Sequence, residues 1–236
     1  MAARNKSTGK NNSVKQNANE QDMSRSALRR QREREHRYQS ILKSAETLFA
    51  SEGYHKASME NIADMSEMSV GALYFYFKNK EALLIELIDE IGQLVRKTLG
   101  AEFKKHGSTL EGFKRAGYAF FEDFCINNPE KVAILLRESV GNGPEVERCR
   151  KEISDKLTGD VKEALLSVCE NQGIRFKSKF AAEVITVSIL GIYERVAYHY
   201  MFWHDMSDDL KPIGRDAVEF ILGGIENLFT ENGSCI

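Results

Sequence analysis

The residues best suited to chemistry in this sequence lie between positions 58 and 80, where small, hydroxyl-bearing and cationic side chains are interspersed with apolar ones. Three small residues stand at the start of a predicted short helix: Val70, Gly71 and Ala72. Small side chains allow a helix backbone to come close to a partner. Tyr74 and Tyr76 follow with hydroxyl groups that can donate to phosphate oxygens, and Lys80 adds a cation at the start of the next predicted helix. This order of side chains predicts a surface that binds a polyanion.

Two short predicted helices hold these side chains in place. Ser58 is suited to cap the first helix and Ser69 the second, because a serine oxygen accepts a hydrogen bond from a free N–H of the first turn. Ser66-Glu67-Met68 forms a tight turn between them. Two short helices joined by such a turn form a helix-turn-helix, whose second helix fits the major groove of B-form DNA.

Three runs of residues in and around this unit follow one known pattern. They are Ile41-Leu42-x-x-Ala45-x-x-Leu48-Phe49-x-x-x-Gly53-Tyr54, Ser58-Met59-x-x-Ile62-Ala63 and Ser69-x-Gly71-Ala72-Leu73-Tyr74-x-Tyr76-Phe77-x-Asn79-Lys80-Glu81-Ala82-Leu83. Over about 47 residues this pattern closely resembles the TetR (tetracycline-repressor-like) family of transcriptional regulators. A helix-turn-helix alone is a weak signal, whereas the run of aromatic residues and lysine that follows this one is highly specific.

The resemblance implies a set of DNA-contacting positions. They are Ser58, Ser69, Val70, Gly71, Ala72, Tyr74, Phe75, Tyr76 and Lys80. Tyr74 matches the tyrosine that contacts phosphate in the family, and Lys80 matches its lysine at the start of the fourth helix. For the two serines a capping role alone is the alternative, and for Tyr76 simple packing. The sequence departs from the family at the turn, where Glu67 replaces the usual glycine and puts a carboxylate near the DNA, which we expect to weaken non-specific binding slightly.

The rest of the chain keeps a helical periodicity without sustained alternation, which predicts an all-α fold of about nine helices. We expect a disordered polar tail over residues 1–24, a DNA-binding domain with a basic N-terminal extension over residues 25–80, and an effector-binding and dimerisation domain over residues 81–236. A long helix from Lys80 to about Phe103 would join the two domains over roughly 36 Å.

Two C-terminal helices are predicted to form a dimer interface. The first begins at Ser178, runs to about Trp203 and is apolar around most of its circumference. The second, over residues 210–229, carries its apolar and small residues on one face: Ala217, Phe220, Ile221, Gly224 and Leu228. Because the family pairs these helices with their symmetry mates in a four-helix bundle, the resemblance implies a homodimer on a palindromic operator in double-stranded DNA.

The effector site is predicted from polar and aromatic residues beside the apolar stripes of the C-terminal domain. The candidates are His106, Phe121, Phe124, Cys125, Arg137 and Tyr193. They favour a small apolar or amphipathic effector, with Arg137 facing a carboxylate or phosphate, and ordinary packing is the alternative for each. An effector bound there would tilt the long helix, move Lys80 and Tyr74, and release the operator, as in a repressor.

Charge is distributed unevenly along the chain. Residues 1–40 carry ten Lys or Arg against four Asp or Glu, whereas the other 196 residues carry 23 against 31. An arginine-rich run from Arg25 to Arg37 leads into the first predicted helix of the DNA-binding unit, where it could be a solvated face or contact DNA. An architectural DNA-binding protein without an effector would explain this basic segment but not the large acidic second part.

Other functions find little support in the sequence. The four cysteines, Cys125, Cys149, Cys169 and Cys235, lack C-x-x-C or zinc-ligand spacing, and no nucleophile motif such as G-x-S-x-G occurs. We therefore expect no enzyme, no metal and no cofactor. Glu194 and Arg195 interrupt the longest apolar stretch, and the N-terminus has no apolar core of a secretory signal, which predicts a cytoplasmic protein without a membrane span.

Overall fold

The computed structural model describes residues 10–229, with the side chains of residues 25–225 and 227–229. Over this range the chain forms nine α-helices and a few π-helical and 3-10 turns. The one β pairing among the described residues is an isolated bridge between Phe176 and Phe229. The predicted all-α fold is confirmed.

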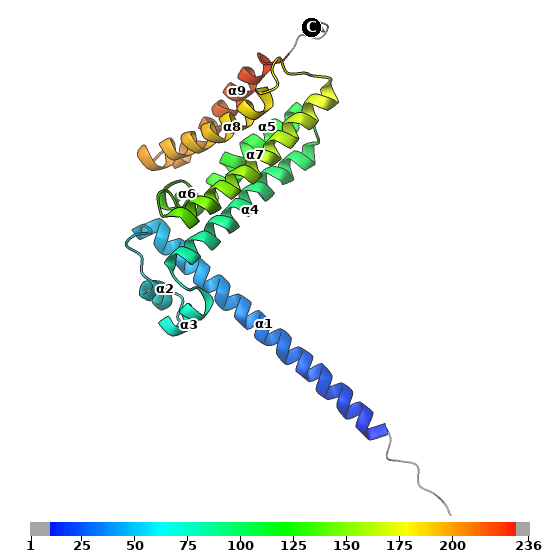
Figure 1. The fold of residues 1–236 in the computed structure, drawn as a ribbon, viewed down its shortest axis with the longest axis vertical. Helices are drawn as coiled ribbons and strands as arrows, with labels where there is room; N and C mark the ends of the chain where they lie inside the picture. The colour runs from blue at the N-terminus through cyan, green and yellow to red at the C-terminus, as the bar shows by residue number, and fades with distance from the viewer. Residues whose placement is uncertain (1–9, 230–236) are drawn as a thin grey trace, which may run out of the picture.

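The elements follow one another in a simple order. The N-terminal part consists of α1 (Lys10–Glu52), α2 (Met59–Met65) and α3 (Val70–Tyr76), followed by the long α4 (Lys80–His106). The remainder consists of α5 (Leu110–Ala119), η1 (Phe120–Cys125), α6 (Pro129–Ala133), η2 (Ile134–Glu138), α7 (Pro144–Gln172), α8 (Ala181–Tyr198), η3 (His199–Trp203), η4 (Ser207–Asp209) and α9 (Leu210–Glu226). Figure 1 shows α4 rising from the α2–α3 end to lie along α5 and α7, with α8 and α9 as a further layer.

Side-chain caps start the helices around the turn. The Ser58 Oγ accepts from the backbone N–H of Asn61 at 3.1 Å, and the Ser69 Oγ accepts from that of Ala72 at 3.2 Å. At the start of α4, the side chain of Asn79 accepts from the next turn in the same way at 2.8 Å. Both predicted serine caps are confirmed, and they set where α2 and α3 begin.

The first helix is longer than predicted. The tail expected to be disordered over residues 1–24 is helical from Lys10 onward, and residues 1–9 lie outside the described residues. Residues 10–24 contain four asparagines, two lysines, two glutamines and two serines, and they have few apolar side chains to bury. Once α1 has formed, however, adding turns to its N-terminal end needs no new nucleus. Figure 1 shows α1 projecting well beyond α2 and α3.

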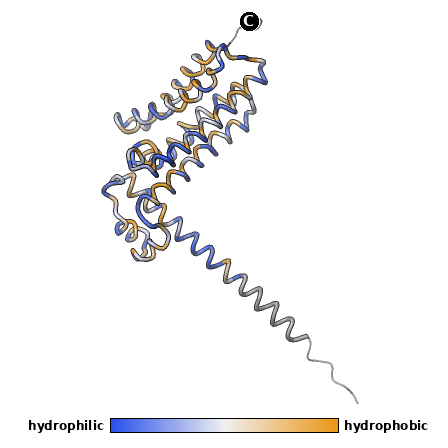
Figure 2. Tube along the Cα trace, viewed as in Figure 1, coloured by the Kyte–Doolittle hydropathy of each residue, from blue (hydrophilic) through white to orange (hydrophobic). Residues whose placement is uncertain are grey.

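A continuous hydrophobic core runs from the helix-turn-helix into the bundle. Fully buried side chains in the N-terminal part come from α1, α2 and α3: Ile41, Phe49, Ile62 and Leu73. The apolar residues in the first half of α4 are buried between the two parts: Leu83, Leu84, Leu87, Ile88 and Ile91. Figure 2 shows hydrophobic stretches where helices meet and a mostly hydrophilic stretch where α1 leaves the helix-turn-helix. Packing against α4 therefore joins the helix-turn-helix to the bundle.

The C-terminal helices differ in detail from the prediction. The helix expected from Ser178 to Trp203 is α-helical only over Ala181–Tyr198 and continues as the π-helical turn η3. The last α-helix ends at Glu226. On α9, Ile221 was expected on the dimer face, but it is buried with Val218 in the core of its own chain.

Candidate DNA-binding surface and effector cavity

The helix α3 presents one open face to solvent. Tyr74 is 48% exposed and Phe75 is 74% exposed, and Gly71, which shares their face at helical spacing, is exposed as well. Leu73 on the opposite side is buried, and Val70 and Tyr76 are partly buried against the core. Among the α3 positions predicted to meet DNA, Gly71, Tyr74 and Phe75 are therefore the most accessible.

Gly71 has no packing role in the fold. A Cβ added there would meet no atom within 4 Å outside its own helix and neighbours. Glycine inside a helix costs up to about 1 kcal/mol relative to alanine. A glycine that disfavours the helix and relieves no clash is suited to the close approach of an external partner, as expected for a helix in a DNA groove.

The turn before α3 keeps its geometry despite the glutamate. Glu67 has φ of 56°, which lies in the left-handed region that glycine adopts easily. The backbone N–H of Met68 donates to the Ala63 carbonyl at 2.9 Å and closes the turn. The substitution therefore changes strain and charge at this position, while the helix-turn-helix itself is retained.

Ser58 is half-buried and Ser69 is exposed, and both use their oxygen as a helix cap. Capping consumes a lone pair and leaves each hydroxyl proton available as a donor. A contact with phosphate is thus compatible with capping at both residues, and the two roles are not exclusive.

Lys80 occupies a different position from the one expected. Its Nζ donates to three backbone carbonyls of the α1–α2 connection, at 2.7 Å to Tyr54, 3.3 Å to His55 and 2.8 Å to Ala57. The ammonium also lies 4.5 Å from the Tyr54 ring centroid, and burial lowers the pKa of Lys80. An ammonium has three N–H donors, and these carbonyls accept from all three. In this structure Lys80 is a clamp between α4 and the α1–α2 connection, and its contact with phosphate stays a prediction.

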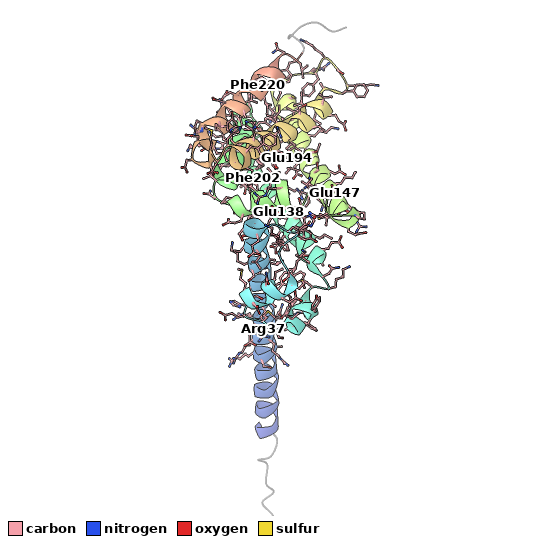
Figure 3. All side chains as sticks on the ribbon, turned by 90° about the vertical axis from the view of Figure 1, so that its left-hand side faces the viewer. Arg37, Glu138, Glu147, Glu194, Phe202 and Phe220 are labelled. Carbon is pink, nitrogen blue, oxygen red and sulfur yellow. The ribbon has the colours of Figure 1, made fainter. Side chains whose placement is uncertain are left out.

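A second junction joins the end of α1 to the bundle. The buried Glu46 pairs with Lys43 on its own helix and with Lys131 on α6. Burial alone would raise the pKa of Glu46, but the hydrogen bonds from Lys131 and Lys43 outweigh it and lower that pKa. The Glu138 Oε2 accepts from the Tyr54 backbone N–H at 2.8 Å, and Figure 3 shows Glu138 where the end of α1 meets the bundle. The helix-turn-helix is thus held by α4 and by the α6–η2 segment.

A cavity of about 660 Å³ lies among α4, α5, α7 and α8. Its apolar wall is formed by large side chains from all four helices: Leu99, Phe103, Phe113, Leu157, Val161 and Ile189. Gly100, Ala116 and Ala164 leave room between them. This volume lies within the range of small-molecule sites in proteins.

Charged side chains line the same cavity. Arg96 pairs with Asp160 through two hydrogen bonds of 2.5 and 3.0 Å. Lys97 and Lys104 are exposed and form no ion pair within residues 25–225. The buried Oγ of Ser167, which also lines the cavity, has no hydrogen-bond partner among the described residues. The site therefore combines an apolar wall, exposed cations, one exposed carboxylate at Glu163 and an unpaired hydroxyl.

The predicted effector residues separate into three groups. Tyr193 lines the cavity, where burial raises its pKa. Phe121, Phe124 and Cys125 do not line it; they are fully buried core residues, as the packing alternative held. His106 lies outside the lining, beside Glu102 on its own helix, at 3.4 Å.

Arg137 is also away from the cavity. Its Nε pairs with Glu138 at 2.5 Å, a second guanidinium nitrogen donates to the Ala50 carbonyl at 3.1 Å, and the group lies 5.0 Å from the Phe202 ring centroid. It therefore belongs to the junction with α1. Sequence reasoning missed the cations of α4 and the whole contribution of α7. Arg96, Gly100, Phe103 and Lys104 share one helical face, which was a signal available in the sequence.

The pair α8–α9 exposes an apolar face. The exposed residues are Phe180, Val184 and Val187 at α8, and Phe220 and Leu228 at or after α9. Figure 3 shows Phe220 far from Arg37, near the opposite end of the molecule from the reading end. On α9, Gly223 and Gly224 are exposed, and a Cβ at either would meet nothing within 4 Å. This face has the composition of a helix–helix interface.

Among the described residues, features of membrane proteins, metalloproteins and disulfide-bonded proteins are few. None of the described helices is long and apolar enough to cross a membrane. Among the described residues there is no group of three or more His, Cys, Asp or Glu that could hold a metal ion. Cys125, Cys149 and Cys169 are free thiols, and Cys235 lies outside the described residues.

Comparison with known proteins identifies the family. The sequence pattern of the bacterial regulatory proteins of the tetR family matches residues 41–87. The fatty acid metabolism regulator protein of Bacillus subtilis (strain 168) is 34% identical over 198 residues, which cover 81% of this chain and 96% of that protein. The chain belongs to the TetR family. The Transposon Tn10 TetC protein of Escherichia coli is 38% identical to this TetR-family member, over 72% of the chain and 83% of TetC.

Other matches are shorter or less similar in sequence. The TetR-family chain spans 39% of the regulator YuxN of Bacillus subtilis, at 29% identity. It shares the fold of FadR from Bacillus subtilis in complex with stearoyl-CoA, with a TM-score of 0.70 and 20% identity over 79% of this chain and 98% of FadR. It also shares that of AibR in complex with isovaleryl coenzyme A and operator DNA, with a TM-score of 0.61 and 22% identity over 78% and 97%. As a member of the TetR family, the protein is a DNA-binding transcriptional regulator.

Proposed function

We propose that this regulator responds to an acyl thioester of coenzyme A, and that binding of the thioester releases it from its operator as a repressor. The observation that carries the proposal is the cavity of about 660 Å³, which joins an apolar wall to free cations. An acyl chain needs the apolar wall, and the phosphates of coenzyme A need cations. A neutral lipophilic ligand would use only the first feature.

Specific side chains support each part of the ligand. Leu99, Phe103 and Leu157 would pack against the acyl chain. The unpaired Ser167 Oγ can donate to the thioester carbonyl. Lys97 and Lys104 line the same cavity as Arg96, on the second half of α4, and would bind the phosphates. The two solved relatives bound to stearoyl-CoA and isovaleryl coenzyme A support this ligand class, with chains of different length.

The helix α4 would carry the signal. It has 27 residues, and at about 1.5 Å per residue the cavity wall at residues 96–104 lies roughly 24–36 Å along the helix from the clamp at Lys80. A ligand that tilts α4 would move the helix-turn-helix through the Lys80 clamp, because that clamp is bonded to three carbonyls of the α1–α2 connection. The lever is thus retained from the sequence prediction, but its DNA-side end acts through protein contacts.

The proposal includes a homodimer in which the exposed faces of α8 and α9 meet their symmetry mates. Two reading heads related by a two-fold axis must match two half-sites about one helical turn apart, so a small change in their spacing lowers the fit. We place the domain boundary near residue 80 and the protein in the cytoplasm, where its DNA target is. We assign it no catalytic role, in keeping with relatives that are named as regulators.

The test is a chain-length series with the full-length protein. Butyryl-, octanoyl- and palmitoyl-CoA are titrated calorimetrically, with coenzyme A alone and palmitate as controls. Each titration is repeated on the protein bound to the duplex palindrome that it selects from a random-sequence pool. Each buried methylene should add about 0.8 kcal/mol until the cavity is full, and every active thioester should bind the DNA-free protein more tightly.

A matched pair of variants tests the cationic part. Lys104→Gln should weaken palmitoyl-CoA several-fold and leave palmitate almost unchanged. Lys105→Gln removes the same charge next door, from a lysine that pairs with Glu102 and does not line the cavity, and should change neither. If the thioesters bound DNA-free and DNA-bound protein equally, or if palmitate bound as tightly as palmitoyl-CoA, the proposal would be wrong.

A further inference from the structure

The arginine-rich part of α1, for which the sequence leaves a solvated face and a DNA contact as alternatives, belongs to neither the α3 surface nor the cavity. Residues 25–37 contain six arginines and two glutamates, and every one of these thirteen positions is exposed. The segment belongs to the part of α1 that projects from the body of the molecule (Figures 1 and 2). A charge run on a helix is most often a solvated face. Two observations indicate more here: the arrangement of the arginines and their contact with the reading helix.

The arginines form two rows on different faces of α1. Arg30, Arg34 and Arg37 follow each other at spacings of four and three residues, so they share one face. The same spacing leads on to Ile41, which is fully buried against the helix-turn-helix core. This row, the inner row, therefore lies on the side of α1 that the reading head occupies. An outer row has the same spacing on another face and consists of Arg25, Arg29 and Arg32.

The inner row is continuous with the DNA-reading surface. The guanidinium of Arg34 lies 6.0 Å from the ring centroid of Phe75, the most exposed aromatic residue of α3. Arg37 lines a cleft of about 630 Å³ together with Ser69 and Ala72 at the head of α3. Figure 3 shows Arg37 on α1 at the level of the helix-turn-helix. Arg34 and Arg37 form no ion pair within residues 25–225, so their charges are available to a ligand.

We propose that Arg30, Arg34 and Arg37 bind the phosphate backbone of DNA that flanks the base pairs read by α3. From Arg30 to Arg37 the helix advances about 10 Å, and duplex DNA carries one phosphate charge per about 1.7 Å of its axis, so three guanidinium groups can each meet a phosphate. Such contacts are independent of sequence. The footprint of each half-site is therefore longer than the part that α3 reads, and the flanks contribute affinity without contributing specificity.

The test uses the full-length protein and two duplexes. Both carry the palindrome selected from a random pool; one ends at its edges, and the other adds flanks of about one helical turn, roughly 10 bp, on each side. The inner-row variant is Arg30→Gln, Arg34→Gln and Arg37→Gln together. The outer-row variant is Arg25→Gln, Arg29→Gln and Arg32→Gln, which removes the same charge from the same helix. Affinities are measured at several salt concentrations.

The wild-type protein should bind the flanked duplex more tightly and with a steeper salt dependence. At about 0.9 per phosphate, six arginines of a dimer account for a slope difference of about 5. The inner-row variant should lose this advantage, while its affinity for the short duplex should fall much less. An unchanged midpoint of urea denaturation shows that the variant is folded. The outer-row variant should keep most of the advantage. A third variant with lysine at the three inner positions should keep most of it as well, because the charge is retained.

Three results would overturn the proposal. The first is equal affinity of the wild type for both duplexes. The second is an equal loss in the inner-row and outer-row variants, which would reduce the effect to general charge. The third is binding of the wild type to anionic phosphatidylglycerol vesicles that the inner-row variant loses while its flank advantage persists, since the partner would then be a membrane surface.

Discussion

The first lysine of α4 and the lysines beside the cavity, near its other end, differ in whether they have hydrogen-bond or ion-pair partners within the protein. At the first residue of α4, the Nζ of Lys80 donates hydrogen bonds to three backbone carbonyls of the α1–α2 connection. In the second half, Lys97 and Lys104 remain exposed beside a cavity of about 660 Å³, close to the unpaired Ser167 Oγ. The ammonium of Lys80 thus makes all its hydrogen bonds within the protein, whereas these three groups beside the cavity have no protein partners among the described residues.

This difference shows how one helix can serve two sites. A satisfied buried charge is costly to disturb, so the Lys80 end keeps α4 and the helix-turn-helix together as one body. At the other end, Lys97 and Lys104 are exposed and have no ion pair among the described residues, so the proposed ligand could bind them without breaking a protein contact.

Replacing Lys80 should lower the stability of the protein. We expect Lys80→Met to lower the free energy of unfolding by about 1–3 kcal/mol, because it leaves partly buried carbonyls without their charged donor. Urea denaturation measures the change. Lys78→Met, which removes an exposed lysine two residues earlier, should stay within about 0.5 kcal/mol. A Lys80 variant with unchanged stability and uniformly weaker DNA binding would restore the phosphate anchor instead.

Filling the cavity should strongly weaken thioester binding and leave the Lys80 contacts and operator affinity unchanged. Ala164→Phe places a ring in the space that Ala164 leaves in the wall, and we expect at least about a hundredfold loss of thioester affinity, or about 2.7 kcal/mol. Operator affinity without ligand should be unchanged, and calorimetry with DNA-binding assays checks both. The exposed Leu166 on the same helix does not line the cavity, so Leu166→Phe should leave both affinities as they are.

Two glycines sharpen the contrast between the cavity wall and the reading helix. A Cβ at Gly117 would lie 2.3 Å from the Tyr193 hydroxyl, whose ring is held between Phe120 and Phe121. Gly117→Ala should therefore destabilise the fold by about 1–3 kcal/mol. Gly71→Ala meets no atom of the protein and should stabilise it by up to about 1 kcal/mol while weakening DNA binding.

Thermal unfolding and DNA titration of the two alanine variants separate these effects. Gly71 should show opposite signs for stability and DNA affinity, because its missing side chain serves an external partner. If Gly71→Ala bound DNA as the wild type does, the close-approach interpretation of this glycine would fail.

The smallest effect is expected at the turn. Glu67 has φ of 56°, so Glu67→Gly should raise the free energy of unfolding by about 1 kcal/mol by relieving the left-handed strain. Loss of its carboxylate should also strengthen binding to random-sequence DNA at low salt. Glu60→Gln, an exposed acidic residue on α2, provides a comparison for charge alone. A fall in stability would mean that the Glu67 side chain makes a contribution larger than its backbone strain.

The reading end could be predicted almost residue by residue. Its caps, its turn and the buried stripe of α4 depend on neighbours three to seven positions apart, and the serine caps at Ser58 and Ser69 were found where expected. The effector site could not be predicted in the same way. Only Tyr193 of six candidates lines the cavity, while Phe121 and Phe124 fill the core and Arg137 joins the α1 junction.

Local spacing and capping were enough to predict the helix-turn-helix, the all-α fold and the family, because they decide where short helices begin and which face they bury. The packing of helices that are distant in sequence decided which side chains of α4, α5, α7 and α8 surround a cavity. It also decided the role of Lys80. The spacing put a cation at the start of α4, but whether that cation meets a phosphate or three backbone carbonyls depends on where the α1–α2 connection lies.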